Sequence, residues 1–237
     1  MTSAFTASLA AFLVTLLSGL GALYLRRHKS LVFASSAGAL IGGAALFLLP
    51  DALELFERST TSLPAYVVWV VAVSGFAAFY ALEYAHHSTE STRLAGIGGG
   101  IGLAVHSFID GVLIGQALRA GGEIGVVLAG AVMLHRVADG ASAVGLMLGT
   151  EHGIRQTATM LFVTAAAPVA GAVAQSFVYL PTFLLALLLS FFSGMLFYLG
   201  AKRLLPEARK ASASGATVAV SFLGGVGLVY AAYLLSH

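Results

Sequence analysis

The chain contains no cysteine and little charge, and each shortage excludes a class of protein. Only 9% of its 237 residues are charged, whereas soluble domains carry about 25%. The mean hydropathy is +0.94, which indicates an integral membrane protein. Without cysteine, disulfides and thiolate metal ligands are excluded. This argues against copper(I) and leaves imidazole, carboxylate and water as metal ligands. The net charge of +2 is too small to indicate a nucleic-acid partner.

Several familiar motifs are also missing. The sequence has neither the G-x-x-x-x-G-K-[ST] motif of ATP-binding loops nor the H-E-x-x-H motif of zinc hydrolases. The N-terminus lacks the charged, short-apolar and cleavage-site pattern of a secretory signal. We therefore expect the first apolar segment to remain as a membrane span, and any transport to be driven by gradients.

Long apolar runs alternate with short loops along the whole chain. A membrane-spanning helix needs about 20 apolar residues, and these runs lack the alternating polarity of barrel strands. We predict an all-α integral membrane protein with a single transmembrane domain over residues 1–237. Its eight predicted spans cover residues 4–25, 31–57, 63–85, 95–118, 123–149, 155–178, 182–205 and 215–236.

The basic residues are unevenly divided between the two sides that eight spans would create. One side has only Arg58 and Arg119. The other holds nine basic residues: Arg26, Arg27, Lys29, Arg93, Arg155, Lys202, Arg203, Arg209 and Lys210. Since cytoplasmic loops are enriched in Lys and Arg, we predict a cell (plasma or inner) membrane protein with both termini outside the cytoplasm.

A hexapeptide of the form H-x-x-x-D-G occurs twice, as HSFIDG at residues 106–111 and HRVADG at 135–140. Residues four apart share one helix face, so each copy points one imidazole and one carboxylate the same way. The two copies lie in consecutive, antiparallel spans. A two-fold axis in the membrane plane would bring together the side chains of His106, Asp110, His135 and Asp139. Two imidazoles and two carboxylates make a suitable shell for a divalent transition metal.

The second and seventh spans resemble each other. The sequence LLPDA at residues 48–52 aligns with LLPEA at 204–208, and Gly38 then aligns with Gly194 without gaps. Spans five apart have opposite orientations. We therefore predict an inverted repeat of spans 1–3 and 6–8 around the central spans 4 and 5, an arrangement that secondary transporters often use.

The two hexapeptides resemble the span-4 and span-5 motifs of the ZIP (Zrt/Irt-like) divalent-metal transporters, which are close to H-N-x-P-E-G and H/Q-E-x-P-E-G. The eight spans, the outside termini and the Leu-Pro-acidic motif are also similar to that family, so the resemblance covers the whole chain. It implies metal transport, with the primary ligands at His106, Asp110, His135 and Asp139.

The sequence departs from the family pattern at several positions. Both carboxylates are Asp and not the longer Glu, and Ile109 and Ala138 replace the prolines. Ser107 replaces the family's Asn and Arg136 replaces its Glu. In the family, these last two positions help to form a second, adjacent metal site, which is therefore altered here.

Arg136 bears on how many ions the site can hold. Arginine does not deprotonate, and a second divalent ion beside it would be repelled in a medium of low dielectric. We hypothesise a single-metal site in which the guanidinium takes the place of the second ion. The alternative is that Arg136 forms an ion pair with Asp110 or Asp139, which would leave a poor transporter.

Acidic and histidine residues near the span ends suggest where an ion enters and leaves. A candidate entrance, which would attract cations, consists of Asp51, Glu54 and Glu57. The alternative is ordinary interfacial charge. A candidate cytoplasmic exit on one helix face consists of Glu83, His86, His87 and Glu90. The alternative is a solvated helix end.

The leading hypothesis is a carrier that moves a divalent metal, with zinc favoured and iron(II), manganese or cadmium as alternatives, from outside into the cytoplasm. The metal would be substrate, and we expect neither an organic cofactor nor enzymatic activity. The alternatives are an intramembrane zinc-dependent hydrolase and a non-transporting metal sensor. Dimers occur in the ZIP family, so a homodimer stays an open alternative. We also expect uptake to weaken at low pH, because protons compete for metal ligands.

Overall fold

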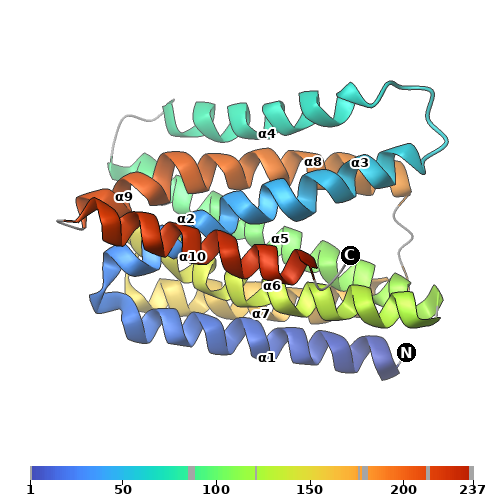
Figure 1. The fold of residues 1–237 in the computed structure, drawn as a ribbon, viewed down its shortest axis with the longest axis horizontal. Helices are drawn as coiled ribbons and strands as arrows, with labels where there is room; N and C mark the ends of the chain where they lie inside the picture. Colours follow the sequence, from blue (N-terminus) through green and yellow to red (C-terminus); the bar gives the residue numbers. More distant parts are fainter. Residues whose placement is uncertain are drawn as a thin grey trace.

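The computed structural model describes residues 2–84, 89–120, 122–175, 177, 181–211 and 214–234. Within these ranges, the side chains of residues 2–4, 89–91, 95, 116–120 and 122–135 lie outside the description. The described residues form helices joined by short connections and include no strand. The helices run along a common axis as one bundle (Figure 1).

The helices correspond to the apolar runs of the sequence. Seven helical stretches in the described part are long and apolar enough to cross a membrane. The 28-residue α6 makes an eighth when it is counted with them. Helices of this length and composition are consistent with a multi-pass membrane protein. Their bounds are α1 Thr2–Tyr24, α2 Lys29–Gly43, α3 Leu49–Glu57, α4 Tyr66–Tyr84, α5 Thr89–Ala120, α6 Gly122–Gly149, α7 Ile154–Ala174, α8 Thr182–Tyr198, α9 Leu205–Lys210 and α10 Gly215–Leu234.

The second and seventh spans are interrupted by π-helical turns at the same place in their motifs. The segment Ala44–Leu48 joins α2 to α3, and Leu199–Leu204 joins α8 to α9. Each precedes a proline in the first turn of the next helix. Proline lacks an N–H and its ring clashes with the carbonyl four residues earlier, so a wider turn relieves the conflict. The helix consequently continues to Lys210, past the end predicted at residue 205.

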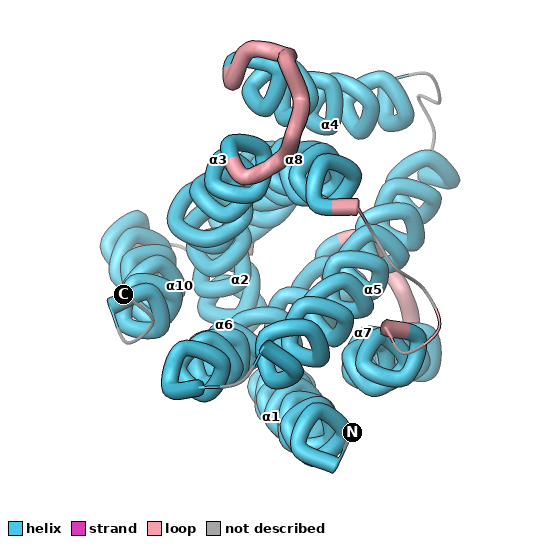
Figure 2. The backbone as a smooth tube through the Cα atoms, turned by 90° about the vertical axis from the view of Figure 1, so that its right-hand side faces the viewer, coloured by secondary structure: helices cyan, strands magenta, loops and turns pink. Residues whose placement is uncertain are grey.

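Glycines permit the closest helix contacts. In Figure 2, α4 lies against α8 and α10 lies against α2, whereas α1 and α7 flank the α5–α6 pair. A methyl group at Gly38 of α2 would collide with the Phe222 carbonyl of α10, and one at Gly194 of α8 would collide with the Ala72 carbonyl of α4. Small residues allow such backbone approach between membrane helices. The two aligned glycines thus hold two different outer helices in the same manner.

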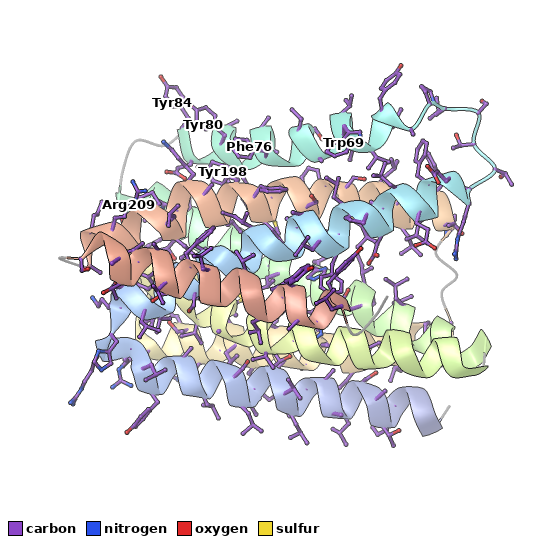
Figure 3. The ribbon with its side chains drawn as sticks, viewed as in Figure 1. Trp69, Phe76, Tyr80, Tyr84, Tyr198 and Arg209 are labelled. Atoms are coloured by element: carbon purple, nitrogen blue, oxygen red, sulfur yellow. The ribbon has the colours of Figure 1, made fainter. Side chains whose placement is uncertain are left out.

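The start of α1 and the end of α10 share one end of the bundle. α1 begins and α10 ends on the right-hand side of Figure 1. Arg209 lies at the opposite end, at the left of Figure 3. The α1–α2 connection, which carries Arg26 and Arg27, lies at that end as well (Figure 1).

Candidate metal site

Three of the four predicted ligands come together in the interior of the bundle. His106 and Asp110 belong to α5 and Asp139 to α6, and their exposed fractions are 2%, 4% and 7%. One ligand atom from each lies within 4.8 Å of the others. His106 Nε2 is 3.4 Å from Asp110 Oδ2, one helical turn along the same face. This buried group could hold a metal ion.

The Arg136 guanidinium lies against the same carboxylates and is completely buried. Its Nη1 donates to Ser107 Oγ at 2.7 Å and lies 3.3 Å from Asp139 Oδ2. Its Nη2 donates to Asp110 Oδ2. Ser107 and Arg136 therefore lie together on one flank of the helix pair. The ion pair of Arg136 that was considered as an alternative is also present, and it involves both Asp110 and Asp139. This pairing offsets the cost of burying three charged groups.

A small cavity adjoins this group. Its volume is about 20 Å³, and its polar lining is His106, Asp139 and Ser142. Phe47 and Leu48, from the π-helical segment of the second span, contribute apolar wall. A cavity of this size holds about one water-sized particle. There is accordingly space beside the ligands for one ion.

Ion binding would require a small rearrangement of these side chains. Ligands at about 2.1 Å from a tetrahedral zinc lie about 3.4 Å from one another, which is less than the 4.8 Å limit within which the three ligand atoms lie. The distances between ligand atoms must therefore shorten by up to about 1.4 Å, and Arg136 must release part of its hold on the acids. With both acids ionised and the imidazole neutral, the guanidinium reduces the negative charge of the site from two to one. A single divalent ion leaves one positive charge, and a second ion would add to it.

The remaining predicted site residues are only partly within the description. His135 lies on α6 one turn before Asp139, but its side chain is outside the described residues. His86 and His87 lie outside them altogether, as does the side chain of Glu90. The structure therefore neither places the fourth ligand nor assembles the cytoplasmic group as a whole.

Glu83, the described member of the candidate exit, joins α4 to the seventh span. The Tyr198 hydroxyl donates to Glu83 Oε2, and Arg203 Nη1 lies 3.3 Å from Glu83 Oε1. Tyr198 is fully buried, and its ring packs edge-on against Phe76 at 5.3 Å between centroids. Figure 3 shows Phe76 and Tyr80 of α4 beside Tyr198. These contacts give Glu83 a role in holding two helices together.

The candidate entrance residues all lie on α3. Asp51 occupies its first turn directly after Pro50, and Glu54 and Glu57 follow at intervals of three residues. Glu54 forms an ion pair with Arg58, and both side chains are exposed. One of the three negative charges is thus offset by a neighbouring cation, which weakens the attraction of this surface for metal ions.

Ser142 is the site residue that the sequence analysis missed. It lies three residues after Asp139 on α6 and lines the same cavity. Helical spacing was the available signal, because residues three apart share a face. A serine hydroxyl is uncharged and common in membrane helices, so it did not stand out beside the histidines and acids.

Comparison of the chain with protein-family models and with curated proteins found no significant match. The resemblance to the ZIP transporters therefore rests on the two hexapeptides and the arrangement of the spans.

Proposed function

We propose that this protein is a ZIP-like carrier that binds one divalent transition-metal ion between α5 and α6 and moves it into the cytoplasm. The buried group of His106, Asp110 and Asp139 carries the proposal. Ionisable side chains within membrane spans are costly and usually mark ion pathways. An imidazole and two carboxylates suit zinc, and they suit iron(II) and manganese as well.

The proposed carrier holds one ion and not two. The position of Arg136, in contact with Ser107 and both acids, supports this part of the proposal. A permanent cation occupies the flank on which the ZIP family would hold a second metal, and like charges repel strongly at such short range. The guanidinium also partly neutralises the empty site, which lowers the cost of leaving two carboxylates in the bilayer.

The proposal includes an inverted repeat of the first three and last three spans. The matching π-helical turns before Pro50 and Pro206 support it. The matching contacts of Gly38 with α10 and of Gly194 with α4 support it too, because the repeat exchanges span 2 with span 7 and span 8 with span 3. Repeats of this kind provide alternating access around a midplane site. The end of the bundle that carries Arg26, Arg27 and Arg209 would face the cytoplasm, with both termini outside.

The experiment is metal uptake into proteoliposomes that contain the purified protein and a metal-sensitive dye. We expect wild type to admit zinc or a related ion, and Asp139→Asn to abolish the uptake. Glu207→Gln is the matched control, because Glu207 pairs with Lys210 on α9 and belongs neither to the buried group nor to the cavity lining, so its loss should leave uptake intact. Absence of uptake by wild type, or uptake by Asp139→Asn at the wild-type rate, would refute the carrier.

A non-transporting metal sensor is the second candidate. The ion pairs of Arg136 with both carboxylates favour it, because they must be loosened each time an ion passes. Metal binding to the purified protein without flux into the vesicles would identify the sensor.

A further inference from the structure

The hydroxyl of Ser142 is one of a few in the described helices that are buried without a hydrogen-bond partner. Ser142 is only 1% exposed, and its Oγ has no hydrogen-bond partner among the described residues. By contrast, Ser190 donates to the Ala186 carbonyl at 2.7 Å and Thr150 to the Leu146 carbonyl at 2.8 Å. Such bonds to the preceding turn are the usual arrangement in apolar helices. An unsatisfied hydroxyl buried away from water is unfavourable, so Ser142 Oγ is available to a ligand.

The position of Ser142 indicates which ligand it serves. It lines the cavity of about 20 Å³ together with His106 and Asp139. Three other buried hydroxyls lack a partner among the described residues, but they do not line that cavity: Thr15 on α1, Ser30 on α2 and Thr164 on α7. Ser142 therefore combines an available oxygen with a place beside the metal ligands.

We propose that Ser142 Oγ is a further ligand of the transported ion. This inference rests on the proposed function, because it concerns the same site. With Ser142, the described ligands become one imidazole nitrogen and three oxygens from His106, Asp110, Asp139 and Ser142. A hydroxyl adds an oxygen ligand without changing the charge of the site, which Arg136 already reduces from two negative charges to one. An oxygen-rich shell of higher coordination number suits manganese(II) and iron(II) better than the soft cadmium ion.

The absence of cysteine makes a direct test available. In Ser142→Cys the introduced thiol is the only one in the chain, and a metal-bound thiolate gives a charge-transfer absorption with cobalt(II) or cadmium. We expect this absorption in Ser142→Cys and a shift of at least about tenfold in the ratio of cadmium to manganese affinity. The matched control is Ser190→Cys, whose native hydroxyl is hydrogen-bonded within α8 and does not line the cavity. It should show neither change.

Ser142→Ala provides a second measurement if the cysteine variant fails to fold. The loss of one ligand should weaken manganese binding by at least about tenfold, since even the loss of an outer partner of a metal ligand costs about 10–100-fold in affinity. Unchanged manganese affinity in Ser142→Ala, or no thiolate absorption in a folded Ser142→Cys that still binds cobalt, would overturn the inference and leave the carrier intact. Equal cobalt binding by wild type and Asp139→Asn would instead refute the proposed metal site and, with it, the proposed function.

Discussion

Replacing Arg136 with glutamine tests whether the guanidinium competes with the metal ion for the carboxylates of Asp110 and Asp139. Arg136 is fully buried, donates to Ser107 Oγ at 2.7 Å and contacts both Asp110 and Asp139. Removing one partner of a buried ion pair costs about 3–5 kcal/mol, because the remaining charge is left uncompensated. We expect Arg136→Gln to lose about that much stability in the absence of metal.

The same substitution should strengthen metal binding. In the wild type, an ion must displace the guanidinium from at least one carboxylate, whereas in Arg136→Gln the ion itself restores the missing positive charge. If about 2.7 kcal/mol of the pairing energy is returned on binding, the ion binds about 100-fold more tightly. The variant is therefore expected to be less stable than wild type without metal and to gain more stability from it.

The assay combines calorimetric titration of detergent-solubilised protein with thermal melting in the presence and absence of zinc or manganese. Arg155→Gln is the control, because Arg155 is an exposed cation in the first turn of α7 and its removal should change neither quantity. Wild-type stability of metal-free Arg136→Gln, together with unchanged or weaker metal affinity, would refute the reasoning. Two tightly bound ions per wild-type chain would refute the single-metal proposal directly.

Three further predictions follow from separate parts of the bundle. Gly38→Ala and Gly194→Ala should each cost about 1–3 kcal/mol of stability through overpacking, whereas Gly224→Ala, where a methyl meets nothing within 4 Å, should cost nothing. Equal stability of all three variants on denaturant unfolding would contradict the matched contacts. Burial of His152 in the α6–α7 connection lowers its pKa, as does the charge of Arg93. Below about pH 6.5, the unfolded chain therefore binds a proton at His152 more readily than the folded protein does, so the free energy of unfolding should fall with falling pH. Thermal melting measured against pH should show a smaller fall in His152→Gln. Metal affinity should decline between about pH 7.5 and 6, since protons compete for the ligands, and a flat titration over that range would contradict a site that contains imidazole.

The sequence alone determined the elements of the fold and the face that each motif presents. The apolar runs have the length that a bilayer requires, so the helices and their approximate bounds could be predicted. The four-residue spacing of His106 and Asp110 placed both on one face of α5, because that spacing is a property of the helix itself. The proline motifs identified matching positions in the second and seventh spans, although not that a π-helical turn precedes each proline.

Only the tertiary structure decided which side chains meet across helices. The partners of Arg136 include Ser107, 29 residues away, and Glu83 meets Tyr198 across 115 residues. Periodicity says which residues share a helix face, but not which other helix lies opposite, since that depends on packing among segments far apart in the chain. The cavity that places Ser142 beside Asp139 and His106 is formed by several helices together, and no local pattern specifies it.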